Sequence, residues 1–340
     1  MTERTVLVTG GAGYVGSHAC KALAAAGYLP VTYDNLVCGH ERAVRWGPFE
    51  KGDLLDSNRL VATLRRYRPS AVMHFAAYCY VGESVIDPFK YYRNNVAGTL
   101  SLLESLREAK IDRLVVSSSC AVYGVPDSPG PIDEERPRHP VNPYGQSKHM
   151  MEQVVRDASV AYGLRAVMLR YFNAAGADPD GDIGEAHDPE THLIPLLLQA
   201  ASESSRPVTV FGTDYPTTDG TCIRDYVHVQ DLANAHVLGL QHAEVSEGVA
   251  AFNLGTGRGY SVREIIDAVR RVTARDPRVV EGPRRPGDPP ELVADATKAR
   301  HTLGWQAEWV DIESIIETAW RWHCRNSAGV ARPTSSVSLA

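Results

Sequence analysis

An apolar run followed by four closely spaced glycines stands near the start of the chain, where residues 5–16 read TVLVTGGAGYVG. The run at residues 5–9 is typical of a buried strand, and a helical pattern of apolar residues begins inside the glycine segment. Glycines allow a sharp turn and let main-chain N–H groups approach a pyrophosphate at the positive end of the helix dipole. The stretch therefore predicts a strand, a dinucleotide-binding turn and a helix, with Gly10, Gly13 and Gly16 at the turn.

A carboxylate follows at the distance that a dinucleotide-binding fold requires. Asp34 lies 18 positions after Gly16 and follows a second expected strand at residues 30–33. A carboxylate there can accept hydrogen bonds from both ribose hydroxyls of an adenosine, whereas it would repel a 2′-phosphate. The pattern therefore favours NAD over NADP, with Asp53, after an expected third strand, on the adenine side. A glycine-rich turn without a ligand is the alternative interpretation.

Strands and helices alternate through the first half of the chain. Further buried strands are expected at residues 71–77, 113–119 and 165–171, and helices at residues 15–26 and 94–109. Regular alternation of this kind is typical of βαβ units. The predicted fold class is therefore α/β, a doubly wound parallel Rossmann sheet with a smaller C-terminal substrate-binding lobe.

The expected domain boundaries follow from a change in composition. After residue 172 the chain becomes rich in Gly, Pro and Asp, and loops of this kind more often line a ligand site than build a core. We expect an NAD-binding domain at residues 1–172, a substrate-binding lobe at residues 173–325 and a disordered tail at residues 326–340. Residues 227–243, which contain a helical pattern, are expected to return to the first domain.

Composition and charge exclude several classes of protein. The chain has 35 basic and 41 acidic residues, a formal net charge of −6, which makes it a poor candidate for nucleic-acid binding. No apolar run reaches the roughly 18 residues that a membrane span needs. The six cysteines lack the spacing of a zinc site or a disulfide scaffold. We therefore expect a cytoplasmic protein with free thiols and no bound metal, in which His187 and His192 are loop residues.

A tyrosine and a lysine stand four positions apart at the start of an expected helix. This spacing places Tyr144 and Lys148 on one helix face, about 5–6 Å apart at Cβ. A tyrosine with the ordinary pKa of about 10 is a poor base, but a fixed ammonium group nearby favours the phenolate. Such a phenolate could take the proton of a sugar hydroxyl while hydride leaves the same carbon. Three serines, residues 117–119, end a neighbouring strand, where one hydroxyl could bind the reacting oxygen.

These motifs resemble those of a known family, the extended short-chain dehydrogenases/reductases, and within it the UDP-sugar 4-epimerases. The resemblance covers nearly the whole chain, from residue 5 to about residue 305. It is carried by residues 8–18 (VTGGAGYVGSH), 33–36 (YDNL), 81–84 (VGES), 94–96 (NNV), 117–124 (SSSCAVYG), 142–144 (NPY), 170–173 (RYFN), 220–226 (GTCIRDY) and 284–288 (RRPGD).

The resemblance implies an isomerase that interconverts UDP-glucose and UDP-galactose through a transient 4-keto sugar, with a tightly bound NAD that is not consumed. Tyr144 would be the base, Lys148 would be the lysine that favours its phenolate, and Ser119 would be the catalytic serine. The family also implies a homodimer built by helix packing.

The resemblance further implies two sets of binding residues. The cofactor-binding residues would be Tyr14, Val15, Asp34, Asn35, Leu36, Val37, Cys38, Gly39, Asp53, Leu54, Phe75, Ala76, Ala77, Asn95, Ser119, Tyr144, Lys148 and Phe172. The substrate-binding residues would be Ser119, Tyr144, Asn173, Leu193, Phe211, Arg224, Arg285 and Asp288, with His192 and Leu292 at the sugar. Two arginines can grip a diphosphate through charge-assisted hydrogen bonds, and a carboxylate can accept from the uridine ribose.

Three departures from the family pattern leave the choice of sugar open. Tyr78 and Cys79 stand where many members have a lysine that contacts the cofactor. His192 replaces an asparagine that touches the sugar nucleotide, and Leu292 stands where a tyrosine or a small residue often lines the sugar pocket. A 4-epimerase of another UDP-sugar, such as UDP-N-acetylglucosamine or UDP-xylose/arabinose, therefore stays an alternative.

Other functions are weighed by the chemistry that they need. A sugar-nucleotide 4,6-dehydratase would need an acid and a base after the active-site serine, which Cys120 and Ala121 cannot supply. A non-catalytic NAD-binding regulator would normally have lost Tyr144 or Lys148. An NAD-dependent sugar-nucleotide oxidoreductase shares the hydride step and stays open.

Overall fold

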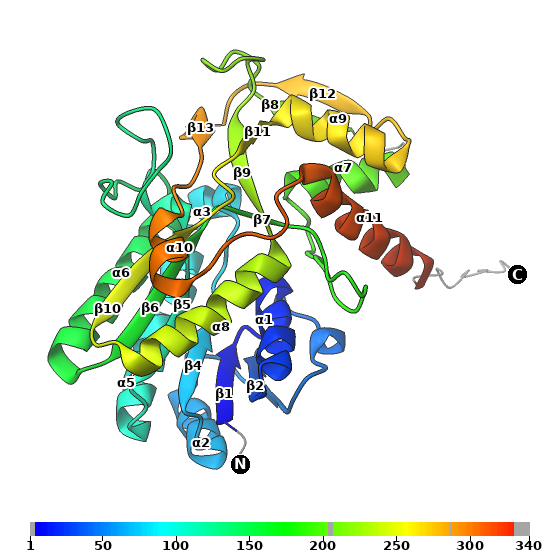
Figure 1. Cartoon of the computed structure of the whole chain (residues 1–340). Helices are drawn as coiled ribbons and strands as arrows, with labels where there is room; N and C mark the ends of the chain where they lie inside the picture. The colour runs from blue at the N-terminus through cyan, green and yellow to red at the C-terminus, as the bar shows by residue number, and fades with distance from the viewer. Residues whose placement is uncertain (1–3, 203–206, 286, 330–340) are drawn as a thin grey trace, which may run out of the picture.

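The computed structural model describes residues 4–202, 207–285 and 287–329 of the chain. Its centre is a parallel sheet of seven strands in the order β10-β6-β5-β4-β1-β2-β3 (Figure 1). The strands are β1 (Arg4–Thr9), β2 (Tyr28–Asp34), β3 (Phe49–Lys51), β4 (Ala71–His74), β5 (Arg113–Ser119), β6 (Arg165–Tyr171) and β10 (Val249–Leu254). The strand order reverses between β1 and β4, which is the point at which doubly wound folds bind their ligands. The predicted fold class is confirmed.

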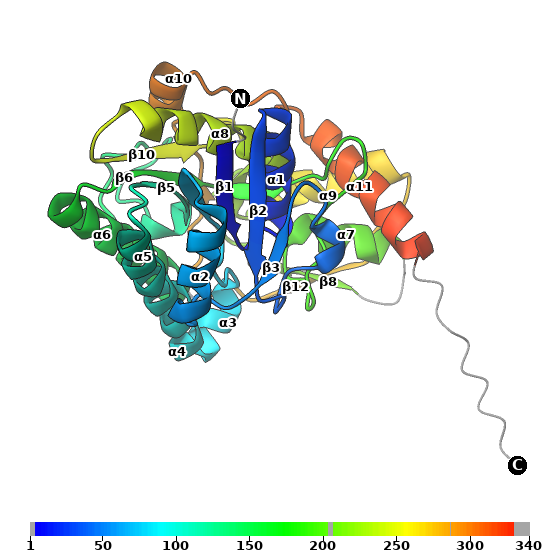
Figure 2. The same cartoon turned by 90° about the horizontal axis from the view of Figure 1, so that it is seen from below.

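Helices cover both faces of this sheet, and Figure 2 shows the sheet between them. Helices α1 (Tyr14–Ala25) and α8 (Val229–Val245) pack on one face, and α2 (Ser57–Tyr67), α5 (Gly98–Ala109) and α6 (Pro143–Tyr162) pack on the other. Neighbouring residues of a strand point to opposite faces. Val6 and Val8 therefore join the core under α1 and α8, while Leu7 joins the core under α2, α5 and α6.

Short elements follow the strand ends on the side where the lobe lies. They are η1 (Glu41–Ala43), α3 (Val81–Ile86), α4 (Pro88–Tyr91), the π-helical turn η2 (Tyr92–Ala97) and η3 (Cys120–Val122). The expected helix at residues 94–109 is thus divided into the end of η2 and the whole of α5.

The smaller lobe lies beyond one end of the sheet (Figure 1). It contains β7 (Asn173–Ala175), α7 (Leu193–Ser202), β8 (Val208–Phe211), β9 (Ile223–His228), β11 (Gly259–Ser261), α9 (Val262–Thr273), β12 (Val279–Gly282), β13 (Glu291–Leu292) and α11 (Ile312–Gly329). Its core is separate and lies between α7, α9 and α11, where Leu197, Ile265 and Ile316 are buried.

The chain returns to the main sheet over a longer segment than expected. The predicted return of residues 227–243 is seen in α8, which packs against β5, β6 and α1. Strand β10 lies inside the expected lobe segment 173–325, yet it forms the edge of the main sheet beside β6. Helix α10 (Thr297–Leu303) packs on β10 and α8. The expected tail at residues 326–340 also needs correction because α11 extends to Gly329, and residues 330–340 lie outside the described residues.

A buried ion pair joins the elements behind the strand ends. Arg170 on β6 is fully buried, and its Nε and Nη2 atoms donate to the two carboxylate oxygens of Glu152 on α6, at 2.8 and 2.6 Å. Ser118 donates to Glu152 at 2.7 Å, and Arg170 donates to the Tyr123 hydroxyl at 2.8 Å. Burial alone would raise the pKa of Glu152, but the hydrogen bonds and the charge of Arg170 lower it. The carboxylate therefore stays ionised inside the protein.

Within the three described stretches of chain, no helix has both the length and the apolar character needed to cross a membrane.

We predict that Arg170→Met lowers the free energy of unfolding by about 3–5 kcal/mol at neutral pH, because it removes the bidentate, fully buried partner of Glu152 and leaves that carboxylate only the Ser118 hydroxyl and the more distant Arg156, at 3.3 Å. Urea denaturation measures this loss. The matched control is Arg65→Met, which breaks the exposed pair of Arg65 with Glu108, whose side chains are 68% and 54% exposed. This control should cost less than about 1 kcal/mol. Because the folded state lowers the pKa of Glu152, the wild-type advantage should shrink as the pH falls below the ordinary pKa of glutamate. Equal losses in the two variants would contradict a structural function of the buried pair.

Candidate active site

A single large cavity opens where the strands of the main sheet end. Its volume is about 1550 Å³, and it extends from the glycine turn to the smaller lobe. One drug-sized ligand normally occupies a pocket of about 300–1,000 Å³, so this cavity has room for two large ligands. All the predicted site residues line it except Leu36 and Asn95.

The glycine turn brings the main chain close to the neighbouring strand. Gly10 has φ of +74°, and a Cβ on it would lie 2.5 Å from the main-chain nitrogen of Ala76. A Cβ on Gly16 would lie 2.2 Å from the carbonyl oxygen of Gly10. Helix α1 begins beside this turn with Gly13 at its N-cap, and no side chain caps it. The first amides of α1 therefore face the cavity as an anion site, and only glycine fits the turn.

Asp34 ends β2 at the rim of this turn. It is 8% exposed, and its carboxylate accepts hydrogen bonds from the main-chain N–H groups of Ala12 and Leu36, at 3.0 and 2.8 Å. Burial raises the pKa of Asp34, and these two hydrogen bonds oppose that effect. A carboxylate has about four acceptor positions, so two stay available for the hydroxyls of a ribose. Asp53 lines the same end and accepts from the Asn35 side chain at 2.8 Å.

The three serines at the end of β5 have different partners. The Ser117 hydroxyl lies 2.6 Å from the hydroxyl of Tyr171, and Ser118 points to the other side, where it donates to Glu152. Ser119 caps η3 by accepting from the Ala121 N–H at 3.2 Å, and it lines the cavity. The structure therefore leaves the Ser119 hydroxyl as the one best placed to meet a substrate.

Helix α6 presents Tyr144 and Lys148 to the same part of the cavity. Asn142 caps the helix, its side chain accepting from the Gly145 N–H at 2.9 Å. A Cβ on Gly145 would lie 2.5 Å from the carbonyl oxygen of Ala121. Glycine at this position thus lets α6 approach η3, which brings Tyr144 next to Ser119.

Burial dominates the electrostatics of this group. It raises the pKa of the Tyr144 phenol well above the ordinary value, and a hydrogen bond from Ser119 acts in the opposite direction. Burial also lowers the pKa of Lys148 to about 8. The Lys148 ammonium donates to the main-chain oxygen of Ser117 at 2.9 Å. The protein alone therefore keeps Tyr144 protonated, and a further positive charge is needed beside the phenol to favour the phenolate.

The far end of the cavity carries two arginines. Arg224 on β9 is paired with Asp288 and donates to the main-chain oxygen of Ile223 at 2.7 Å. The Arg285 guanidinium lies 4.0 Å from the centre of the Phe211 ring. Phe211, Asn173 and Leu193 line this end as well. The cavity that holds Tyr144 thus has two places for anionic groups: the main-chain amides of the glycine turn and the arginines of the far end.

Leu292 packs in a small apolar cluster and also lines the cavity. It is 7% exposed and belongs to a small apolar cluster with Cys120, Tyr123 and Phe172. Its side chain therefore helps to shape the wall near Ser119 and Tyr144.

Asn95 lies behind the cavity wall. Its side-chain amide accepts from the Tyr78 N–H at 2.8 Å and donates to the Tyr78 carbonyl at 3.0 Å and to the Ser147 hydroxyl at 2.9 Å. It therefore fixes the main chain of the wall, and of these two neighbouring asparagines Asn94 is the one that lines the cavity.

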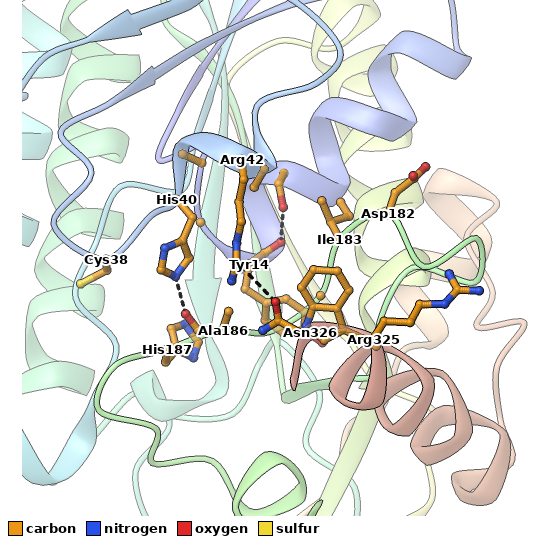
Figure 3. A pocket seen from close by; sticks show the side chains of 16 residues that line it. Tyr14, Cys38, His40, Arg42, Asp182, Ile183, Ala186, His187, Arg325 and Asn326 are labelled. Carbon is orange, nitrogen blue, oxygen red and sulfur yellow. Dashed lines mark hydrogen bonds between the residues drawn. The ribbon is translucent and has the colours of Figure 1, made fainter. Parts of the chain in front are cut away.

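On the loop before α7, sequence reasoning predicted His192 as a site residue but missed Glu185, His187 and Glu190, which line the cavity beside it. His187 and His192 lie in a loop, as expected, and both line the cavity together with Glu185 and Glu190. The alternation of Glu and His at residues 185–192 was the available signal. Figure 3 shows a smaller neighbouring pocket of about 250 Å³, where His40 Nε2 donates to the carbonyl oxygen of Ala186 at 2.6 Å and holds this loop beside α1.

Comparisons with known proteins agree with this geometry. The family described as NAD dependent epimerase/dehydratase matches residues 6–255. A UDP-glucose 4-epimerase from Rhizobium meliloti is 52% identical over 329 residues, which cover 97% of this chain and 100% of that protein. The crystal structure of a UDP-glucose 4-epimerase from Brucella ovis in complex with NAD has 55% identity and a TM-score of 0.90, and covers 93% of this chain and 97% of its own. The structure of the Bifidobacterium longum UDP-glucose 4-epimerase in complex with NAD⁺ and UDP has 39% identity and a TM-score of 0.91, with coverages of 96% and 99%. The chain therefore belongs to the NAD-dependent epimerase/dehydratase family.

Proposed function

We propose that the protein is a UDP-sugar 4-epimerase that interconverts UDP-glucose and UDP-galactose with a retained NAD. The observation that carries this proposal is the placement of Ser119, Tyr144 and Lys148 in one cavity, between a pyrophosphate-binding turn and an arginine-lined end. The relatives named above, which are UDP-glucose 4-epimerases, support the same reaction.

The cofactor end of the cavity fits NAD. The uncapped start of α1 and the glycine turn would hold the pyrophosphate, because a Cβ at Gly10 or Gly16 would fill that space. Asp34 would accept from the ribose hydroxyls, and Lys148 would hold the ribose next to the nicotinamide. When bound, NAD supplies the hydride acceptor for C4 of the sugar, the hydride donor for the reverse step and a positive charge beside Tyr144.

Two side chains of the protein, Tyr144 and Ser119, would transfer and guide the proton of the sugar's 4-hydroxyl. The Tyr144 phenolate takes the proton of the 4-hydroxyl as the C4–H bond breaks, and the sugar becomes a 4-keto sugar. Ser119 donates a hydrogen bond to the reacting oxygen and keeps it next to the phenol. After the sugar turns about its bond to the diphosphate, Tyr144 returns the proton as C4 regains hydride on its other face. The reaction therefore balances with no net redox change.

The arginine-lined end would hold the nucleotide. Arg224 and Arg285 would bind the diphosphate through charge-assisted hydrogen bonds, and Asp288 would accept from the uridine ribose. Asn173, Leu193 and Phe211 complete this end. The anchored diphosphate leaves the sugar free to turn.

A second candidate function is the epimerisation of N-acetylated UDP-sugars. The observation that favours it is Leu292, a residue of intermediate size in the cavity wall, where the sugar's 2-substituent is expected. A net oxidoreductase would need exchange of the nucleotide in each turnover, so activity without added cofactor distinguishes it from an epimerase.

We also propose a cytoplasmic homodimer. Leu100 on α5 and Met150 on α6 are exposed by 44% and 39%, on the two helices that would pack against a second copy. The free cysteines Cys38, Cys79 and Cys324 are exposed, which suits a reducing compartment.

We predict that Tyr144→Phe lowers kcat by about 10²–10⁴-fold, the usual contribution of a general acid–base group, while the Kd for UDP-sugar changes little. Coupled turnover assays and calorimetry measure the two quantities. The matched control is Tyr171→Phe, which removes a half-buried hydroxyl of the same cavity that is hydrogen-bonded to Ser117. It should lose no more than about tenfold. Near-normal turnover of Tyr144→Phe would refute the base assignment.

We predict that the purified protein carries NAD and discriminates against NADP by at least about 100-fold, because a 2′-phosphate would be placed against the carboxylate of Asp34. Mass spectrometry of the extracted nucleotide and competition binding measure this. Asp34→Asn should narrow the preference to less than about tenfold, while the control Asp53→Asn, at the adenine side, should retain it. NADP in the extract of the wild-type protein would overturn the assignment.

We predict that Leu292→Tyr lowers the ratio of kcat/KM for UDP-N-acetylgalactosamine to that for UDP-galactose by at least about tenfold, because a larger side chain narrows the wall. Leu292→Met conserves the volume and should leave the ratio within about threefold. Steady-state kinetics with both substrates measure it. If the tyrosine variant keeps the wild-type ratio, Leu292 does not control access to the pocket.

A further inference from the structure

Four side chains with metal-binding atoms meet on the loop that connects the end of β7 to α7. They are Glu185, His187, Glu190 and His192, and their ligand atoms all lie within 4.8 Å of one another. His187 Nδ1 lies 3.1 Å from a Glu185 oxygen and 3.7 Å from a Glu190 oxygen. His192 Nδ1 lies 2.7 Å from the same Glu185 oxygen and 3.2 Å from Glu190. Each imidazole nitrogen therefore faces both carboxylates.

These separations match the edges of a small coordination tetrahedron. Zinc binds histidine nitrogen and carboxylate oxygen at about 2.0–2.2 Å, so two ligand atoms of a regular tetrahedron lie about 3.3–3.6 Å apart. The four separations between nitrogen and oxygen, 2.7, 3.1, 3.2 and 3.7 Å, lie on both sides of that range. His187 and His192 face different oxygens of Glu190, and the four ligand atoms lie within 4.8 Å of one another, so shifts of up to about one ångström would bring one atom of each residue to a single ion.

His187 Nδ1 lies close to both carboxylates but is not well aligned for a hydrogen bond with either. Its Nδ1 atom is buried and has no hydrogen-bond partner, although a Glu185 oxygen lies 3.1 Å away. A metal-bound nitrogen carries no hydrogen and uses its lone pair, so an undirected close approach of this kind is what a metal site needs.

The charge balance of the loop points in the same direction. The Glu185 and Glu190 side chains are only 7% and 5% exposed, and their ion pairs among the described residues are with the two imidazoles. Two buried carboxylates need two positive charges, which two protonated imidazoles supply without an ion and one divalent cation with two neutral imidazoles supplies when it replaces their protons.

A neighbouring cluster shows the contrast. Asp178, Asp180 and Asp182 also gather in space, but the Lys21 ammonium lies 2.8, 2.7 and 3.3 Å from their oxygens. A lysine, which keeps its charge and does not bind a metal ion in its protonated form, occupies the centre of that cluster. For the Glu185 and Glu190 carboxylates, no lysine or arginine within the described parts of the chain lies at ion-pair distance.

We propose that Glu185, His187, Glu190 and His192 bind one divalent transition-metal ion of the zinc class. Two imidazole nitrogens exclude the hard cations Mg²⁺ and Ca²⁺, which take oxygen ligands, and four protein ligands in a tetrahedron are typical of a structural zinc site. The ion fixes the loop that forms one wall of the main cavity and holds the His192 ring at that wall. This site is separate from the proton chemistry of Tyr144 and does not depend on it.

The loop is already held in place for such a site. The carbonyl oxygen of Ala186, between two of the ligands, accepts from His40 at 2.6 Å (Figure 3). The rings of Tyr80 and His187 meet edge to face with centroids 5.6 Å apart. Binding of the ion therefore needs little ordering of the chain.

The test uses the full-length protein after dialysis against a chelator. Zn²⁺ is titrated in competition with a chromophoric chelator, and Co²⁺ is added separately to record its visible spectrum. We expect one ion per chain, the intense d–d bands of four-coordinate Co²⁺, and a Tm that rises with the Zn²⁺ concentration. His187→Asn and Glu190→Gln should each weaken binding by more than about 100-fold, since loss of an outer partner alone costs up to that much.

Controls separate this site from other metal-binding groups. His301→Gln changes an exposed histidine on α10 and should leave the affinity unchanged. Cys38→Ser and Cys79→Ser change the two exposed cysteines among those that line the same cavity and should also leave the affinity unchanged. Circular dichroism of each variant verifies that it is folded, and Glu185→Gln provides a further ligand variant if one of the others fails to fold.

Three results would overturn the proposal. The first is the absence of saturable binding at one ion per chain. The second is equal affinity of the wild-type protein and the His187→Asn and Glu190→Gln variants. The third is a thiolate-to-cobalt charge-transfer band that disappears in Cys38→Ser or Cys79→Ser, which would assign the ion to the cysteines.

Discussion

The pairing of helix α6 with the end of strand β5 is the constraint on which the site depends. One face of α6 carries Tyr144, Lys148 and Glu152 at intervals of four residues, and each contacts one of the three serines that end β5. Tyr144 meets Ser119, Lys148 meets the carbonyl of Ser117, and Glu152 meets the Ser118 hydroxyl. Because Glu152 is also bound by a fully buried arginine of β6, the core fixes the rotation of α6. The ion pair of Glu152 with Arg170 therefore also fixes the position of Tyr144 at the start of α6.

Much of the fold and the cofactor end could be predicted because they depend on local patterns. The strands at residues 113–119 and 165–171 have the predicted bounds, since both are buried on two faces and appear as continuous apolar runs. The glycine turn could be predicted because its glycines stand together between a strand pattern and a helix pattern, although the contact that requires Gly10 is with the distant Ala76. The pair of Tyr144 and Lys148 follows from helical spacing alone.

The parts that escaped prediction depend on contacts between distant segments. Strand β10 is a short apolar segment, but it pairs with β6, which lies far away in the sequence, and no local pattern in residues 249–254 shows that pairing. Nothing in the sequence around Asn95 shows that its side-chain amide is hydrogen-bonded to Tyr78 and Ser147 and does not line the cavity. An arginine within a strand suggests an exposed edge, whereas Arg170 is buried because α6 brings it a carboxylate. The four ligand-type residues of the loop before α7 form a repeated Glu-x-His pattern, but only the folded loop brings the two pairs together.

The return of α8 and β10 to the main sheet has a consequence for how such a protein can be divided. A chain that stopped at residue 172 would leave β6 as a bare edge and the apolar face around Val167 and Leu169 without its covering helix. A chain that began there would carry α8 and β10 with no sheet to join. Neither lobe is therefore a module that a single crossover between genes could exchange. New substrate preferences in this architecture have to arise by substitutions within an intact chain, as at Leu292, and not by replacement of the lobe.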